Sequence, residues 1–257
     1  MRTEARINSE GESRRMKTHQ GLKLAILAAL LFCGACWLYA ADGYRADDAA
    51  IAATHSTGEV IVEQKGNTLA FIPENAETGF IFYPGGKVEY TAYAPLMRAL
   101  ADSGVLGVLV SMPLNLAVLD VNAASGIPEQ YPQVRRWYIG GHSLGGSMAA
   151  SHAAKNSSAY EGLVLLAAYS TADLSASALP VISIYGSEDG VLNMEKYAGY
   201  RRNLPTAFEE HIIEGGCHAG FGSYGSQDGD GVPTLTGEAQ TAETARLLTA
   251  FFKSTQE

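Results

Sequence analysis

Residues 137–150 read Trp-Tyr-Ile-Gly-Gly-His-Ser-Leu-Gly-Gly-Ser-Met-Ala-Ala, and they carry the most specific structural pattern in the sequence. An apolar run leads into a serine framed by glycines, Ser143, and then into small residues that a helix tolerates. The pattern predicts a buried strand, a very tight turn and a helix packed close behind it. A serine in such a turn has a strained backbone, which lifts its hydroxyl off the sheet edge. The glycines leave room for the neighbouring strand and helix, because side chains there would collide with them.

The charge of the chain is unevenly distributed. The sequence has 257 residues, of which 47% are hydrophobic and 18% charged, and this is enough for one sizeable core. The first 41 residues carry six basic and three acidic side chains, whereas the remainder carries twelve and twenty-four. A net charge near −12 in the remainder would repel phosphates. Nucleic acid and anionic membrane surfaces are therefore excluded as partners of this part.

The N-terminal segment predicts attachment to a membrane or export. Residues 24–41 contain no charge, and they follow a basic segment at residues 1–23. About twenty apolar residues span a bilayer as a helix, and the positive-inside bias puts the basic end in the cytoplasm. We expect an uncleaved signal anchor, with a cleaved signal peptide or a lipoprotein modified at Cys36 as alternatives. Residues 42–58 lack periodicity and are interpreted as a linker, so a folded domain at residues 59–257 would lie outside the cytoplasm and touch the membrane only through the N-terminal segment.

Strand and helix patterns alternate through the rest of the chain. Residues 59–64 and 68–72 alternate apolar and polar side chains around a turn at residues 65–67, which predicts a hairpin. Further strands are expected at residues 79–83, 105–112, 137–140, 162–168, 180–185 and 207–213, and further helices at residues 90–102, 116–124, 191–202 and 236–253. This alternation predicts an α/β fold with a mainly parallel sheet and helices on both faces. No insertion is large enough for a large lid domain, and the gap between residues 166 and 180 has room only for a small lid.

Side chains suited to chemistry follow several of the predicted strands. In open parallel sheets, ligands bind at the carboxyl ends of the strands. Ser143 follows one strand, and its hydroxyl needs a base to remove its proton. His218, in a glycine-rich loop after the last strand, is the candidate base. The imidazole needs a carboxylate to orient it, and we favour Asp189 over its neighbour Glu188 because a short side chain in a G-x-x-D turn usually makes this contact.

Attack by Ser143 on a carbonyl group would also require two backbone N–H groups to hold the oxyanion. Leu144 follows the serine at the start of a helix and is the first candidate donor. Gly86 follows the strand at residues 79–83 and is the favoured second donor, with Lys87 as the alternative. The sequence therefore predicts a site for acyl chemistry at this edge of the sheet.

The chain resembles the α/β-hydrolase superfamily and, within it, the small dienelactone-hydrolase-like group. The resemblance covers about residues 59–253 and rests on Gly-His-Ser-Leu-Gly around Ser143, on the order Ser143, Asp189, His218, and on Tyr-Pro-Gly-Gly at residues 83–86. It implies an eight-stranded, mostly parallel sheet, an acyl-enzyme mechanism, and no metal or organic cofactor. Dienelactone hydrolases use a cysteine nucleophile, whereas this chain has Ser143. The resemblance therefore implies that the substrate is an ester or related acyl compound of a small molecule.

Other interpretations of the same residues are open. An acyltransferase or a peptidase would use the same three side chains, and a non-enzymatic binding module would keep only the fold. Residues 226–231, Ser-Gln-Asp-Gly-Asp-Gly, resemble a calcium loop but lack its closing Glu, so we expect a rim loop beside the candidate base and no metal site. Three aromatic residues are candidates either for lining the acyl pocket or for the core: Tyr90, Phe221 and Tyr224.

Overall fold

The structure, a computed structural model, describes residues 42–255 and, of the segment before them, residues 23, 26–28, 30, 31, 34 and 39. The chain divides into two compact units, residues 1–42 and residues 43–257. Most of the anchor or signal peptide predicted at residues 24–41, and nearly all of the basic segment before it, lies outside the described residues, so both stay predictions. Among the described residues, none of the helices combines the length and the apolar character that crossing a bilayer requires.

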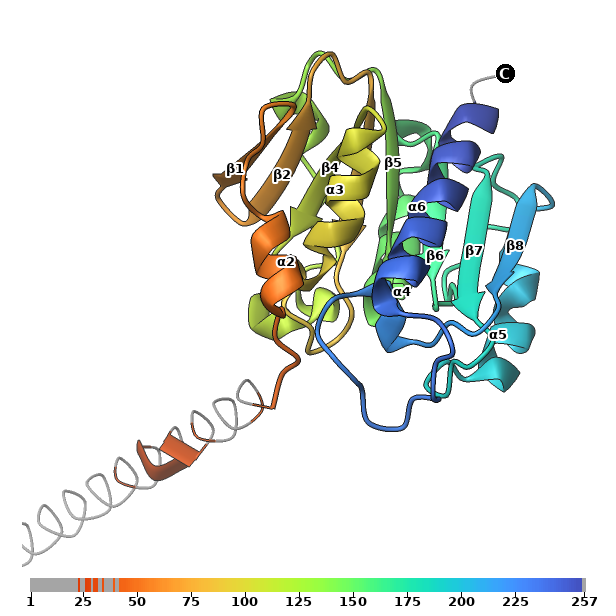
Figure 1. Cartoon of the computed structure of the whole chain (residues 1–257). Coiled ribbons are helices and arrows are strands. Elements are labelled where there is room, and N and C mark those ends of the chain that lie inside the picture. The colour runs from red at the N-terminus through yellow and green to blue at the C-terminus, as the bar shows by residue number, and fades with distance from the viewer. Residues whose placement is uncertain are drawn as a thin grey trace, which may run out of the picture. The chain divides into compact units, whose positions relative to one another are not determined.

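The second unit is built on one sheet of eight strands with helices on both sides (Figure 1). The strands lie in the order β1-β2-β4-β3-β5-β6-β7-β8. The neighbours from β4 to β8 pair in parallel, whereas β2 is antiparallel to both β1 and β4. The strands are β1 (Val60–Lys65), β2 (Thr68–Pro73), β3 (Thr78–Tyr83), β4 (Val105–Val110), β5 (Arg136–His142), β6 (Gly162–Leu166), β7 (Val181–Gly186) and β8 (Phe208–Ile213). The predicted hairpin and the predicted parallel sheet are confirmed.

Alternate side chains of the central strands enter two separate cores. In β3, Phe80 and Phe82 pack on the face covered by helices α3 and α6, whereas Ile81 and Tyr83 pack on the face covered by α4. Successive side chains of a strand point to opposite faces, so a strand buried on both sides is apolar throughout. The helices are α2 (Asp48–Ala53), α3 (Ala94–Asp102), α4 (Leu144–Ala153), α5 (Met194–Tyr200) and α6 (Gly237–Ser254). No large lid domain interrupts residues 42–255.

One predicted helix is wrong. Residues 116–124 form a short 3-10 turn at Ala117–Leu119, followed by further turns. The hydroxyl of Tyr83 binds the backbone of this segment, since it donates to the carbonyl oxygen of Val121 (3.0 Å) and accepts from the N–H of Ala124 (2.7 Å). A helix would use these backbone groups in its own hydrogen bonds. Contact with the sheet has therefore replaced the helix.

The segment interpreted as a linker, residues 42–58, contains helix α2. Asp47 caps this helix, because its carboxylate accepts from the N–H of Ala50 (2.9 Å). Arg98 of α3 donates to the carbonyl oxygen of Ala53 (2.9 Å), and Ala50 is fully buried. Six helical residues are too few to give a clear apolar period, which is why the sequence pattern missed them. The folded unit therefore begins before residue 59.

Candidate active site

Ser143 occupies the turn between β5 and α4, at the carboxyl end of a central strand. Its backbone angles are φ 52° and ψ −122°, a conformation that costs a residue other than glycine about 1–3 kcal/mol. Its N–H donates to the carbonyl oxygen of Leu166 in β6 (2.9 Å), which holds the turn against the next strand. The strained serine turn predicted from the sequence is confirmed.

The glycines around this turn are required by close approaches of backbone to backbone. A Cβ on Gly141 would overlap the carbonyl oxygen of Tyr83, and a Cβ on Gly145 would overlap the carbonyl oxygens of Tyr83 and Pro84. No rotamer change can relieve such an overlap, because the atoms that are met belong to the main chain. The expectation that these glycines make room for the neighbouring strand is therefore confirmed.

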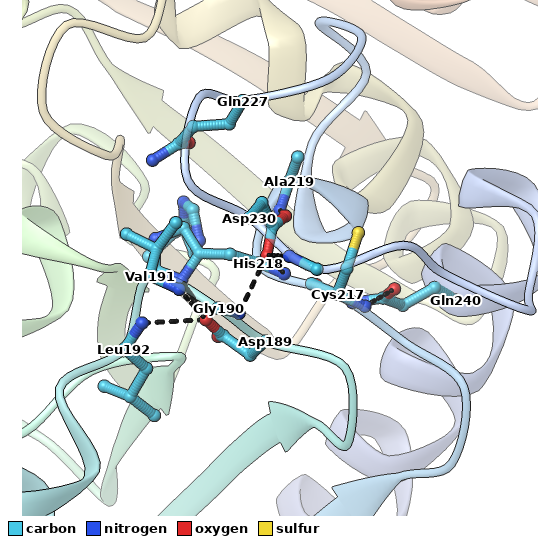
Figure 2. Close-up of polar contacts among 12 residues, drawn as sticks. Asp189, Gly190, Val191, Leu192, Cys217, His218, Ala219, Gln227, Asp230 and Gln240 are labelled. Atoms are coloured by element: carbon cyan, nitrogen blue, oxygen red, sulfur yellow. Dashed lines mark hydrogen bonds and ion pairs between the residues drawn. The ribbon is translucent and has the colours of Figure 1, made fainter.

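Asp189 and His218 form a buried pair (Figure 2). Nδ1 of His218 lies 2.9 Å from Oδ2 and 3.1 Å from Oδ1 of Asp189, and each side chain is 1% exposed. Oδ1 of Asp189 also accepts from the N–H groups of Val191 (2.9 Å) and Leu192 (2.8 Å). A carboxylate held in this way keeps the imidazole proton on Nδ1 and leaves Nε2 as an acceptor.

The competing carboxylate, Glu188, takes no part in this pair. Its side chain is exposed and accepts from the hydroxyl of Ser187 (3.1 Å). The structure therefore places Asp189, and not its neighbour, against the imidazole of His218, as the sequence favoured.

Ser143 and His218 line the same pocket, which has a volume of about 250 Å³. Nε2 of His218 is buried and has no hydrogen-bond partner within residues 42–255, so the hydroxyl of Ser143 is not bonded to it in this structure. Catalytic hydrogen bonds are often formed or tightened only when substrate is bound. The two groups are thus brought to one cavity with the acceptor nitrogen of His218 still free.

The wall of this pocket is mostly apolar. It includes Leu144, Ala167, Ala168, Tyr169, Val191 and Leu192. The three aromatic candidates from the sequence do not line this pocket. Phe221 and Tyr224 belong to the buried core, and the hydroxyl of Tyr90 donates to Gln64 (3.0 Å).

Gly86 packs against the side chain of Leu144, which lines the pocket. A Cβ on Gly86 would be 3.2 Å from Cδ2 and 3.5 Å from Cβ of Leu144. Within the described residues, neither N–H group is bonded to an acceptor, and the first N–H groups of a helix have no intrahelical partner. The alternative donor, Lys87, already gives its N–H to the carbonyl oxygen of Asn115 (2.9 Å). Gly86 and Leu144 thus keep unbonded N–H groups, and their role as oxyanion donors stays a prediction.

A second buried histidine, His142, packs beside the candidate base, with 4.4 Å between the centroids of the His142 and His218 rings. Nδ1 of His142 lies 2.8 Å from the hydroxyl of Tyr93, which accepts from the N–H of Gly85 (3.0 Å). The Tyr93 hydroxyl thus joins the His142 ring to the backbone of Gly85, while Nε2 of His142 is buried without a hydrogen-bond partner among the described residues. Burial, and then the nearby His218, hold the pKa of His142 well below its ordinary value.

We expect His142 to make the fold sensitive to acid. Below about pH 6.5 the unfolded chain takes up a proton at His142 and the folded chain does not, so the free energy of unfolding falls as the pH falls. In a His142→Asn variant the free energy of unfolding should depend less on pH, with a slope smaller by up to about 1.4 kcal/mol per pH unit. Urea unfolding of both proteins between about pH 7 and about pH 5 measures the two slopes. Equal slopes would contradict this role of His142.

Two side chains that the sequence did not single out fix the loop that carries His218. Gln240 of α6 is buried, accepts from the N–H of Cys217 (3.0 Å) and donates to its carbonyl oxygen (2.8 Å). Asp230 accepts from the N–H groups of His218 (3.1 Å) and Ala219 (2.8 Å), as Figure 2 shows. The expectation that residues near Asp230 lie beside the candidate base is confirmed. The Asp-Gly-Asp-Gly run at residues 228–231 indicated a loop, but it did not indicate which groups the carboxylate of Asp230 binds.

Neither a reactive thiol nor a metal cluster is found at this site. Cys217 is buried, and its burial raises the pKa of its thiol to about 11, which keeps it protonated at neutral pH. In the part of the chain that the structure describes, no group of three or more His, Cys, Asp or Glu side chains is arranged to hold a metal ion.

The sequence model of the alpha/beta hydrolase family matches residues 79–242. No curated protein is a significant match to the chain. Similar solved structures include TT1662 from Thermus thermophilus, which is 16% identical with a TM-score of 0.56 over 77% of this chain and 99% of that one. A dienelactone hydrolase from Anabaena variabilis is 16% identical with a TM-score of 0.52, over 76% of this chain and 96% of its own. The structure of a mutant of the esterase rPPE is 16% identical with a TM-score of 0.54, over 79% of this chain and 88% of that one.

Proposed function

The chain belongs to the alpha/beta hydrolase family, and we propose that it is a serine hydrolase that cleaves carboxylic esters of small molecules. The observation that carries this proposal is the buried pair of His218 and Asp189, which shares one pocket with Ser143 on its strained turn. A serine hydroxyl is a weak nucleophile, and an imidazole oriented by a carboxylate is the base that most often activates it. The presence of an esterase and a dienelactone hydrolase among similar structures supports this class of reaction.

The first half of the reaction acylates the enzyme. Oγ of Ser143 attacks the ester carbonyl carbon while Nε2 of His218 takes the hydroxyl proton, and Asp189 stabilises the imidazolium that forms. The N–H groups of Gly86 and Leu144 bind the negative oxygen of the tetrahedral intermediate. When the intermediate collapses, the alcohol leaves with the proton from His218, and the acyl group stays on Ser143.

The second half releases the acid. A water molecule gives a proton to Nε2 of His218 and attacks the acyl carbon, and the same two N–H groups hold the oxyanion. Collapse of this second intermediate returns the proton to Ser143 and frees the carboxylic acid. These side chains and N–H groups supply every proton transfer and charge contact, so the proposed reaction consumes only ester and water.

The size and the lining of the pocket support a small, apolar acyl group. The cavity has a volume of about 250 Å³, below the range of about 300–1,000 Å³ typical of pockets for drug-sized ligands. Leu144, Val191 and Leu192 give it apolar walls. We therefore expect short acyl esters to react faster than long-chain ones.

Labelling with a fluorophosphonate probe tests the nucleophile directly. We expect one equivalent of probe on the folded protein, and peptide mass spectrometry should place it on Ser143. Ser147 is the matched control, because it lines the same pocket but donates its hydroxyl to the carbonyl oxygen of Tyr169 (2.7 Å). Absence of labelling on the folded protein would favour a binding module without catalysis.

Product analysis then separates hydrolysis from transfer. Incubation with a small ester and a competing alcohol should give mainly the free acid if water is the natural acceptor. Predominant formation of the new ester would identify an acyltransferase instead, and cleavage of peptides but not of esters would identify a peptidase.

A further inference from the structure

The carboxylate of Asp230 is bound by backbone N–H groups from three parts of the chain. Oδ1 accepts from the N–H groups of Gly190 (3.1 Å), His218 (3.1 Å) and Gly231 (2.9 Å), and Oδ2 accepts from the N–H of Ala219 (2.8 Å). Partial burial would raise the pKa of Asp230, but these four hydrogen bonds together lower it. The side chain is therefore an anion at neutral pH whose acceptor sites are used by the main chain.

The loops joined by Asp230 are the two that carry the candidate acid and the candidate base. Gly190 directly follows Asp189, whereas Ala219 directly follows His218. Figure 2 shows Asp230 between these two loops, with dashed lines that run from it toward both. A single carboxylate thus connects the backbone of one loop to the backbone of the other, next to the side-chain pair that the proposed mechanism uses.

Backbone packing keeps the Asp230 segment in place. A Cβ on Gly231 would overlap the carbonyl oxygen of Glu188, and a Cβ on Gly190 would lie 2.6 Å from the carbonyl oxygen of Gly229. The segment from Gly229 to Gly231 therefore lies directly on the loop that carries the candidate acid. Side chains at either glycine would separate the two segments and pull the carboxylate away from its donors.

We propose that Asp230 is a positioning residue of this site, which fixes the loop of His218 against the loop of Asp189 so that the imidazole stays within hydrogen-bond reach of its carboxylate. The expected effect on turnover rests on the proposed function, whereas the expected effect on the position of the His218 ring does not. Asp189 orients the ring of the histidine through Nδ1, while Asp230 holds its backbone N–H. Displacement of a catalytic group by about 1 Å costs about 100-fold in rate, so an anchor of this kind acts on turnover.

The kinetic test compares Asp230→Asn and Asp230→Ala with the wild-type protein. An asparagine can keep the three hydrogen bonds to Oδ1, but its amide N–H₂ would take the place of Oδ2 and face another donor, the N–H of Ala219. An alanine removes all four hydrogen bonds. We expect kcat for ester hydrolysis to fall about 10-fold in Asp230→Asn and about 100-fold in Asp230→Ala, with KM within about twofold. Asp228→Asn is the matched control, because it removes an exposed charge from the same loop and should leave kcat unchanged.

A measurement without turnover separates this proposal from the proposed function. The proton on Nδ1 of His218 is observable by NMR while its hydrogen bond to Asp189 persists, and a His218→Gln variant assigns it. We expect this proton to exchange with water faster in Asp230→Ala than in the wild-type and Asp228→Asn proteins, with each variant held well below its Tm. Unchanged proton exchange in Asp230→Ala, or a kcat within about twofold of wild type, would overturn the proposal. If the wild-type protein neither hydrolyses esters nor takes up the fluorophosphonate probe, the proposed function fails, while the NMR comparison still decides the role of Asp230.

Discussion

Replacing Ser143 with alanine should lower kcat for ester hydrolysis by about 1,000-fold or more and leave the fold intact. The loss is large because the reaction then has no covalent route, and only the oxyanion donors and substrate binding are left to act on a water molecule. Stability should change little, since the Ser143 hydroxyl makes no hydrogen bond within the described residues and alanine has the same preference against positive φ. Steady-state kinetics on a short acyl ester and thermal unfolding measure the two effects.

Ser147→Ala provides the control for this experiment. Ser147 lies four residues further along, on α4, and lines the same pocket, but its hydroxyl is held by the carbonyl oxygen of Tyr169. We expect this variant to keep kcat within about threefold of wild type, because it removes only one part-buried hydrogen bond of about 1 kcal/mol. Wild-type turnover in Ser143→Ala, or a 1,000-fold loss in Ser147→Ala instead, would move the nucleophile away from Ser143.

The parts of the fold that were predictable are those in which a local pattern has one structural solution. A continuous apolar run as short as residues 79–83, stopped by Pro84 and glycines, favours a strand that is buried on both faces, and the structure has one there. The turn at residues 65–67 leads from one alternating run to another, and the hairpin follows. The glycine frame of Ser143 permits a backbone approach that other residues would block, so it predicted the strained turn as well as the position of the strand.

Two predicted helices differ from the structure because a side chain binds backbone groups at or near them. Residues 116–124 have helical spacing, but Tyr83 takes a carbonyl oxygen and an N–H from them. The helix predicted from residue 191 starts only at Met194, because Asn193 is extended and caps the helix by accepting from the N–H of Lys196 (2.9 Å). In both places a hydrogen bond made by one side chain decides where the helix forms, and the apolar spacing does not report it.

The residues of the candidate site also fall into those that the sequence predicted and those that it did not. Ser143, Asp189 and His218 each follow a strand, so the topology of a parallel sheet was enough to bring them to one edge. Asp230 and Gln240 act on the backbone of the His218 loop, and their spacing from it in the sequence carries no periodic signal. The groups that would carry out the chemistry were therefore visible in the sequence, whereas the groups that hold them in place became visible only in three dimensions.

Asp189→Asn should lower kcat by about 10,000-fold, an effect as large as the loss of the nucleophile. Oδ1 of Asp189 accepts from the N–H groups of Val191 and Leu192, so an asparagine would keep its carbonyl oxygen at that position. Its amide N–H₂ would then replace Oδ2 and donate to Nδ1 of His218. The imidazole proton would move to Nε2, the atom that has to accept the proton of Ser143, so the base would be lost although every heavy atom keeps its place.

Glu188→Gln is the control that makes this result specific. Glu188 is the neighbouring carboxylate, but it is exposed and accepts a hydrogen bond from the Ser187 hydroxyl instead of from His218, so its loss should leave kcat within about twofold. Kinetics on the same short ester, together with the Tm of each variant, compare the two substitutions. A loss of less than about 10-fold in Asp189→Asn would show that His218 does not depend on this carboxylate for its tautomer, and a large loss in Glu188→Gln would assign that role to Glu188 instead. Ser143, His218 and Asp189 act as one catalytic triad only if Asp189→Asn is nearly inactive and Glu188→Gln is not.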